Sequence, residues 1–221
     1  MNPGDFVYIE YIGRVKDSGE IFDLTREDIA KKEGLYNPKF KYNPVPVIVD
    51  ADFLIHGLNE ALKEMKVGEK KTVEIPSSKA FGERQAELIK IIPESKFKEQ
   101  GVDVKPGSIV TISRINGRVI SVDGGRVKVD FNHPLAGKTL EYELEVKEEI
   151  KNLGEKIMAV VCYFTGLEKS DVDTSIKEKE AEINIKKKVD VLREVKQTIS
   201  STIIKWVKEI EKVKFVEIFE K

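Results

Sequence analysis

Reactive and metal-binding side chains are scarce in this sequence. Its 221 residues include one cysteine, Cys162, and two histidines, His56 and His133. A single cysteine excludes an internal disulfide framework, and no Cys or His cluster with the spacing of a zinc site is present. Cys162 lies in the apolar run IMAVVCYF, where we expect a buried, inert thiol. We therefore expect neither a metal site nor a cofactor.

The sequence also lacks an excess of charge of one sign and any long apolar run. Lysine and arginine total 38, aspartate and glutamate 39, and the net charge is −1, whereas nucleic-acid binders usually carry a basic excess. The run Lys186-Lys187-Lys188 is then a solvated face rather than a phosphate site. No stretch is long enough to span a bilayer, and MNPGDFVY lacks the features of a signal peptide. We expect a cytoplasmic protein that binds neither nucleic acid nor membranes.

What the chain does contain is hydrophobic periodicity, which predicts an α+β domain in its first part. Alternation predicts strands, and an apolar stripe at helical spacing predicts a helix from Phe53 to Met65. Thr25 and Asp28 could form a capping box for a short helix that Gly34 ends. Short strands with one packed helix are typical of an antiparallel sheet of the α+β class. The expected strands are 6–16, 21–23, 47–49 and 70–76, with an extended loop at 37–46.

Two further units are expected after Glu83. The first is rich in strands, with a hairpin across Asp123-Gly124-Gly125. A strand at 140–146 then returns to the first sheet. The second unit follows Gly154 and is predicted as ββαβ. Its expected elements are strands at 157–164 and 181–185, an amphipathic helix at 189–210, and a strand at 215–219. Those of the first unit are strands at 88–92, 108–112, 118–122 and 126–130 and a helical turn at 94–99.

Several dispersed motifs together resemble one family. Tyr11 followed by Gly13, then GEIFD, LIHGLNEAL, VGEKKTVEIP and AFG, resemble the FKBP-type peptidyl-prolyl cis–trans isomerases. The later NHPLAGKTLEYELEV is similar to the closing strand of the SlyD-like branch, which carries a flap domain inserted between AFG and NHPLAG. The extension after Gly154 resembles the long-chain archaeal members. The resemblance spans residues 4–150.

The resemblance implies an organisation, an activity and a set of site residues. It implies an isomerase domain at 1–83 and 131–152, a flap domain with chaperone activity at 84–130, and a C-terminal domain at 153–221. Separately, the apolar helix stripe and Trp206 of this last domain could mediate a homodimer. The implied partners are unfolded or partly folded chains that contain X–Pro bonds. The implied catalytic residues are Tyr11, Asp23, Phe81 and Tyr142, and the implied substrate-binding residues are Phe22, Leu54, Ile55, Leu58, Ala80 and Leu135.

This chemistry suits a pocket that has no nucleophile. Rotation about an X–Pro bond meets a barrier of about 20 kcal/mol because twisting destroys amide resonance, and no covalent intermediate is required. A pocket lowers the barrier by binding the twisted amide better than either planar form. A thousandfold gain needs only about 4 kcal/mol of such differential binding. By the resemblance, the Ile55 N–H donates a hydrogen bond to a carbonyl of the substrate peptide. Asp23 either interacts electrostatically with the carbonyl carbon of the rotating amide or holds Tyr11 in place.

Other interpretations of the same residues stay open. From pattern alone, Leu54, Leu58 and Tyr142 could simply be core, and Asp23 could cap the following turn. Helical phase points His56 away from the pocket residues, which favours a surface histidine, and His133 could be a metal ligand or a hinge residue.

The pocket also departs from the family's usual pattern at two positions. Leu58 replaces the family's usual tryptophan, and Val45 an aromatic residue, so the pocket is wider. A non-catalytic peptide-binding module on the same scaffold is therefore the alternative function.

Overall fold

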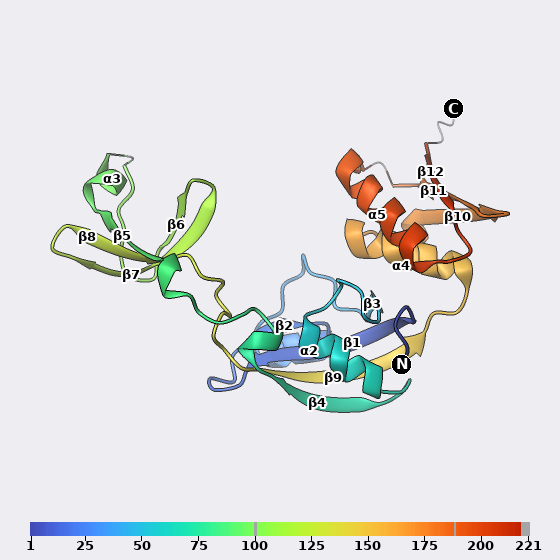
Figure 1. Ribbon diagram of the computed structural model, residues 1–221, viewed down its shortest axis with the longest axis horizontal. Helices are drawn as coiled ribbons and strands as arrows, with labels where there is room; N and C mark the ends of the chain where they lie inside the picture. The colour runs from blue at the N-terminus through green and yellow to red at the C-terminus, as the bar shows by residue number, and fades with distance from the viewer. Residues whose placement is uncertain (100, 188, 218–221) are drawn as a thin grey trace. The chain divides into compact units, whose positions relative to one another are not determined.

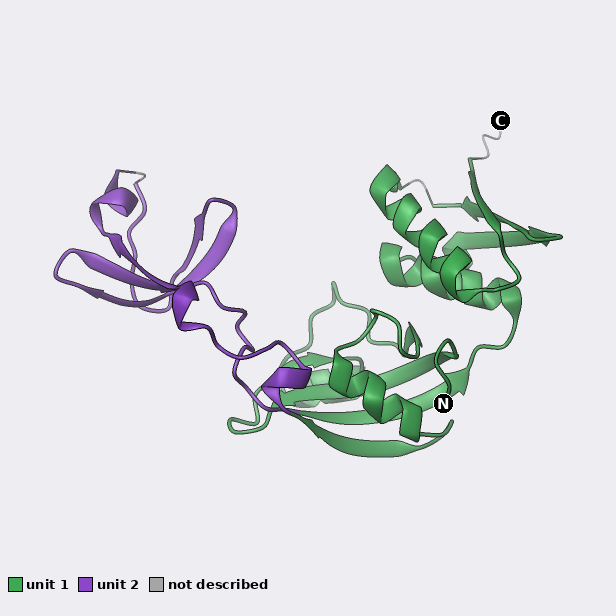
Figure 2. Cartoon of the chain, in the orientation of Figure 1, with its two compact units in different colours: residues 1–75, 141–221 green, residues 76–140 purple. Residues whose placement is uncertain are grey.

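The computed structural model describes residues 1–99, 101–187 and 189–217. The chain forms two compact units, one made of residues 1–75 and 141–221 and the other of residues 76–140 (Figure 2). The second unit is thus inserted into the first, between two strands of the first unit's larger sheet. Among the described residues, no helix combines the length and the apolar character that crossing a membrane requires.

The larger unit is built on a five-stranded antiparallel sheet (Figure 1). Its strands follow the order β2-β1-β9-β4, and β3 pairs separately with β1. Helix α2 (His56–Glu64) packs on this sheet through Leu58 and Leu62, which are 2% and 0% exposed. A Cβ atom at Gly57 would collide with Ile75, so glycine is what allows the helix to approach β4 closely. The strands are β1 (Phe6–Val15), β2 (Ile21–Leu24), β3 (Val45–Ile48), β4 (Lys70–Ile75) and β9 (Leu140–Glu149).

The predicted strands of this sheet are confirmed, but two helix starts differ from the expectation. Helix α1 (Glu27–Lys32) has Arg26 as its N-cap, so the predicted capping box is wrong. Thr25 instead accepts a hydrogen bond from the Tyr11 amide at 2.9 Å. Helix α2 begins at His56 rather than Phe53 because the preceding residues form a turn that starts at Asp50, whose φ of 63° is left-handed.

The inserted unit contains a four-stranded antiparallel sheet in the order β5-β8-β7-β6. The hairpin predicted at residues 123–125 joins β7 to β8, and Gly124 and Gly125 supply φ values of 54° and 72°. A second hairpin, between β6 and β7, was not predicted because its turn residues, Ser113 and Arg114, adopt positive φ without glycine. The elements are β5 (Ile89–Pro93), α3 (Ser95–Lys98), β6 (Ile109–Ile112), β7 (Ile115–Asp123) and β8 (Arg126–Asp130).

The C-terminal part of the larger unit corrects one expectation. The segment predicted as a strand at 157–164 lies within helix α4 (Leu153–Thr165). The Asn152 side chain caps its start by accepting from the Glu155 amide, and Gly166 ends it in the left-handed conformation. A ββαβ order follows this helix, but its first strand is not the segment predicted at 157–164. Its elements are β10 (Val172–Lys177), β11 (Glu180–Ile185), α5 (Arg193–Trp206) and β12 (Lys212–Val216).

Two details of this part also differ from the expectation. The predicted helix at 189–210 is confirmed in a shorter form as α5, and β10 was not predicted. The last predicted strand, 215–219, overlaps β12, but residues 218 and 219 lie outside the described residues.

One hydrophobic core joins the five-stranded sheet to the C-terminal elements. Phe6, Ile48 and Ala51 from the sheet region belong to the same buried cluster as Ile157 of α4 and Ile199 of α5. All five are at most 4% exposed. The Tyr163 ring near the end of α4 lies 4.2 Å from the Phe53 ring, centroid to centroid, and Phe53 packs against this core in the loop that precedes α2.

Candidate active site

A tyrosine and a carboxylate meet on neighbouring strands. The Tyr11 hydroxyl, on β1, donates a hydrogen bond to Asp23 Oδ2, on β2, at 2.8 Å. Asp23 remains exposed, whereas the Tyr11 side chain is half-buried. The pair therefore presents an acceptor carboxylate to solvent beside an aromatic surface.

Two more aromatic rings complete this surface. Tyr142, on β9, lies edge-on to Tyr11 with ring centroids 5.8 Å apart, and Phe22 lies edge-on to Tyr142 at 5.7 Å. A Cβ at Gly13 would come within 2.8 Å of Phe22 Cζ and 3.0 Å of Tyr142 Cε1. Because Gly13 has no side chain, the rings of Phe22 and Tyr142 can both pack against β1 at this position.

Burial keeps both phenols protonated. Desolvation raises the pKa of Tyr11 above its ordinary value, and the charge and hydrogen bond of Asp23 raise it further. Burial likewise raises the pKa of Tyr142, with a smaller contribution from the Asp23 charge. Near neutral pH, Tyr11 is therefore a hydrogen-bond donor and the site holds no phenolate.

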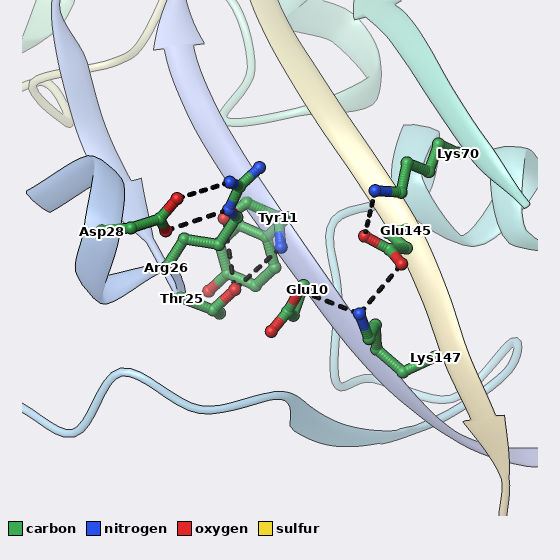
Figure 3. Close-up of polar contacts among 8 residues, drawn as sticks. All are labelled: Glu10, Tyr11, Thr25, Arg26, Asp28, Lys70, Glu145 and Lys147. Atoms are coloured by element: carbon green, nitrogen blue, oxygen red, sulfur yellow. Dashed lines mark hydrogen bonds and ion pairs between the residues drawn. The ribbon is translucent and has the colours of Figure 1, made fainter. Parts of the chain in front are cut away.

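The backbone of Tyr11 is fixed by Thr25, which is 4% exposed. The Tyr11 amide donates to Thr25 Oγ1 at 2.9 Å (Figure 3). The Thr25 amide donates to the Tyr11 carbonyl at 3.0 Å. Consecutive residues of a strand face opposite sides, so Glu10 belongs to a different surface. There Lys147 Nζ lies 3.4 Å from Glu10 and 2.9 Å from Glu145.

The loop before α2 carries the next two predicted residues. Leu54 and Ile55 are half-buried, and Ile55 is the N-cap of α2. The first N–H groups at a helix start have no acceptor within the helix, so this backbone can donate to a bound carbonyl. Asn59, 7% exposed, fixes the loop from inside: its amide donates to the carbonyls of Ala51 at 3.1 Å and Leu54 at 3.3 Å.

The predicted floor residue, Leu58, lies one helical turn beyond the Leu54–Ile55 pair and is buried. The histidine between them is on the surface: His56 Nε2 lies 3.1 Å from Glu60 Oε1 and its side chain is 66% exposed. Val45, the other position where the pocket departs from the family pattern, begins β3 opposite Ile9 and is half-buried.

Three predicted residues, Ala80, Phe81 and Leu135, lie in the inserted unit. The Phe81 ring stacks on His133 with centroids 4.2 Å apart and an interplanar angle of 3°. His133 Nδ1 also accepts from the Leu135 amide at 3.2 Å, so one imidazole links two predicted residues. The Ala80 amide donates to the Ser77 carbonyl at 3.0 Å at the end of a short 3-10 turn.

Four residues that sequence analysis did not place in the site support it. They are Thr25, Asn59, His133 and Tyr163. Asn59 gave a signal that could have been used, since it is a polar residue next to the apolar stripe of an amphipathic helix. The others act through contacts distant in sequence. Among the described residues, no group of three His, Cys, Asp or Glu side chains could hold a metal ion.

Family models and curated relatives agree on the family. Residues 90–135 match the model described as "FKBP26, IF domain", and residues 154–220 match that described as "FKBP26_C-terminal". A short-type peptidyl-prolyl cis-trans isomerase of Methanocaldococcus jannaschii is 38% identical over 148 residues, which are 67% of this chain and 93% of that protein. The FKBP-type isomerase SlyD of Treponema pallidum is 36% identical over 151 residues, or 64% of this chain and 73% of that protein.

An α+β fold with one helix packed on an antiparallel sheet is the architecture that the motifs implied. The chain belongs to the FKBP-type peptidyl-prolyl cis–trans isomerases. Within that family it combines the FKBP26 inserted domain with the FKBP26 C-terminal domain.

Proposed function

We propose that this chain accelerates protein folding by isomerising X–Pro bonds in unfolded or partly folded chains, and that its flap adds chaperone activity. The observation that carries the catalytic part is the Tyr11–Asp23 hydrogen bond beside Tyr142 and Phe22. A neutral phenol, a carboxylate and aromatic edges close together support catalysis by noncovalent stabilisation of the twisted amide.

The reaction follows from what each group does to a twisted amide. In this proposal Leu54, Leu58, Phe81 and Tyr142 bind the proline ring, and Phe22, Ala80 and Leu135 are further substrate-binding residues. The Ile55 N–H donates to a carbonyl of the peptide. Asp23 holds Tyr11 and faces the rotating carbonyl carbon. Each contact lowers the barrier only to the extent that it favours the twisted form over the planar forms.

We assign these activities to three parts of the chain. Residues 1–83 and 131–152 form the isomerase domain, residues 84–130 the flap, and residues 153–221 the C-terminal domain. Arg84 and Asp130, at the two ends of the proposed flap, form an ion pair in which Arg84 Nη2 lies 2.6 Å from Asp130 Oδ2. This pair supports the flap boundary because it closes the segment on itself where the chain enters and leaves.

Exposed apolar residues support the chaperone activity of the flap. Ile91, Ile109 and Ile115 are 65%, 66% and 58% exposed. Strands β5 and β6 lie at the two edges of the flap sheet, and an edge strand can accept an extended peptide by strand addition. Unfolded chains supply both the apolar side chains and the unpaired backbone that such a surface binds.

The catalytic proposal is tested by substituting Asp23 in a proline-limited refolding assay. We expect Asp23→Ala to lower the second-order rate constant about tenfold, equivalent to about 1.4 kcal/mol of transition-state stabilisation. The matched control is Asp17→Ala, an exposed carboxylate in the turn after β1, which should leave the rate unchanged. Equal rates for all three proteins would contradict the assignment of Asp23, and no acceleration by the unmodified chain would contradict the isomerase function.

A non-catalytic binding module is the second candidate, and the leucine at the pocket floor favours it. Leu58 fills less space than tryptophan, so the site could hold proline without selecting the twisted amide. A proline-containing tetrapeptide separates the two functions. Accelerated isomerisation of that peptide supports catalysis in the pocket itself, whereas activity confined to protein substrates points to capture by the flap.

We also propose a homodimer formed through the C-terminal domain. Leu192 and Ile204 are 64% and 45% exposed, and apolar residues of this size on a surface favour association. The double variant Leu192→Asp, Ile204→Asp should sediment as a monomer if the proposal is correct. An unchanged sedimentation coefficient for this variant and the unmodified chain would reject it.

A further inference from the structure

A large groove lies in the larger unit beside the loop that carries Leu54 and Ile55. Its volume is about 870 Å³, near the upper end of the range for clefts that bind small ligands. One wall comes from the segment that leads into β3, and the other from the end of α4 and the residues after it. The lining residues are Tyr8, Lys41, Asn43, Pro44, Val45, Pro46, Lys147, Glu148, Cys162, Tyr163, Gly166, Leu167, Glu168 and Lys169.

Tyr163 belongs both to this groove and to the support of the active-site loop. Its hydroxyl donates to the Phe53 carbonyl at 3.1 Å, and its ring lies 4.2 Å from the Phe53 ring, centroid to centroid. Phe53 directly precedes Leu54 and Ile55. Tyr163 therefore links the groove to the loop that carries two residues of the proposed prolyl site.

Two of the three lysines that line the groove are paired with carboxylates. Lys41 Nζ contacts the Gly166 carbonyl at 3.1 Å and Glu168 at 3.2 Å. Lys169 Nζ lies 4.6 Å above the centre of the Tyr8 ring, and Lys147 contacts Glu10 and Glu145. Such a lining does not select a strongly charged ligand such as a phosphate. It suits a ligand of mixed apolar and amide character.

Prolines limit how such a ligand can bind. Pro44 and Pro46 have no backbone N–H, so the segment beside β3 cannot donate a continuous ladder of hydrogen bonds to an added strand. Side chains of the groove, among them Tyr8, Tyr163 and Leu167, therefore make the contacts with the ligand. Contacts of this kind hold the side chains of an extended polypeptide rather than its backbone.

From the Tyr163 link to the active-site loop, and from the size and chemistry of the groove, we propose that it binds the substrate segment that flanks the prolyl bond. This inference rests on the proposed isomerase function and deepens it. The occupant is an uncharged or weakly charged stretch of the same unfolded chain whose proline lies in the pocket. Because α4 builds one wall, the C-terminal domain takes part in substrate binding through its own residues.

Cys162 provides a specific way to block the groove. It lines the groove, it is partly exposed, and it is the only cysteine of the chain. Burial raises the pKa of its thiol, so alkylation with a bulky maleimide is carried out at mildly alkaline pH, where the thiolate is better populated. Retention of the melting temperature after labelling shows that the fold is intact.

The labelled chain is assayed on a tetrapeptide that fits the pocket alone and on a longer peptide with a single proline. We expect labelling to raise the KM for the longer peptide about fivefold, a loss of about 1 kcal/mol of binding, and to leave the tetrapeptide unaffected. The Cys162→Ala variant exposed to the same reagent controls for reaction elsewhere. Equal effects on both substrates, or no effect on either, overturn the groove proposal. Failure of the unlabelled chain on both substrates counts against the isomerase function instead.

A photocrosslinker on Cys162 then locates the peptide. With a benzophenone maleimide, we expect crosslinks to concentrate at a fixed number of residues from the proline of the longer peptide. Moving that proline along the peptide should move the crosslinked position by the same number of residues. Crosslinks spread evenly along the peptide, or none at all, would overturn the proposal.

Discussion

The chain contains two antiparallel sheets that use their apolar residues in opposite ways. The five-stranded sheet of the larger unit shares a core with α4 and α5, in which Ile199 is fully buried. The four-stranded flap sheet has a small core built around Val127 and Val129 and leaves Ile109 66% exposed. The same residue type is thus buried in one unit and exposed on the other, and the exposed residues form the surface to which we assign client binding.

The largest expected effect separates these two uses of isoleucine. Ile199→Ala should lower the free energy of unfolding of the larger unit by about 3 kcal/mol, because it removes buried methyl groups and leaves a cavity. Ile109→Ala, in the flap, should change stability by less than about 0.5 kcal/mol. Calorimetry measures both, and the fluorescence of Trp206, the chain's one tryptophan, identifies the transition of the larger unit. Equal costs would break the comparison.

The next effect concerns the flap surface itself. The triple variant of Ile91, Ile109 and Ile115 to serine should lower the suppression of aggregation about tenfold, equivalent to losing about 1.4 kcal/mol of client binding. Its tetrapeptide activity and melting temperature should stay unchanged.

The control for the flap variant replaces Leu35, Phe40 and Val67 with serine. These residues are 46%, 68% and 50% exposed outside the flap. An equal loss in both triple variants would show that exposed apolar area, rather than the flap, suppresses aggregation.

The smallest expected effect is a difference between the two units in how their free energy of unfolding changes at alkaline pH. Burial raises the pKa of Tyr11 and Tyr142 above the ordinary 10.0, whereas residues 76–140 contain no tyrosine. Above pH 10.0 the unfolded chain loses these protons before the folded chain does, so the free energy of unfolding of the larger unit falls with pH. Below that pH both states keep the protons and the contribution is fully present.

Each such phenol contributes a slope of at most about 1.4 kcal/mol per pH unit. Chemical denaturation followed by Trp206 fluorescence at several alkaline pH values measures the slope. Tyr142→Phe should reduce it, and the flap transition should not share it. An identical slope in the variant would contradict the assignment to Tyr142.

Strands with clear alternation and the helix before Gly68 could be predicted from sequence, but α4 could not be assigned correctly. Its run IMAVVCYF is rich in β-branched and aromatic residues, which also favour strands. Asn152 before the run and Gly166 after it are typical start and stop residues of a helix, and together they favour a helix over a strand despite that composition. The short strand β10 was not predicted because most of its residues are polar. It has too few apolar residues to show the alternation by which a strand with one buried face is predicted.

Motif resemblance supplied the proposed site residues on β1, β2, α2 and β9, because these lie in contiguous sequence blocks. It could not supply Tyr163, whose contact with Phe53 spans 110 positions. Nor did it supply Thr25, whose side chain was assigned to a helix cap and instead fixes Tyr11. Contacts of this kind depend on tertiary packing that local sequence does not encode.

Insertion of the flap between β4 and β9 has a consequence for kinetics. The flap is attached to the larger unit by two covalent connections, at its entry and at its exit, so it cannot diffuse away. If the flap holds clients as proposed, a held client meets the proposed prolyl pocket at an effective concentration set by those connections, in the millimolar range for short flexible tethers. A pocket with weak intrinsic affinity, such as one floored by Leu58, would still be occupied under those conditions.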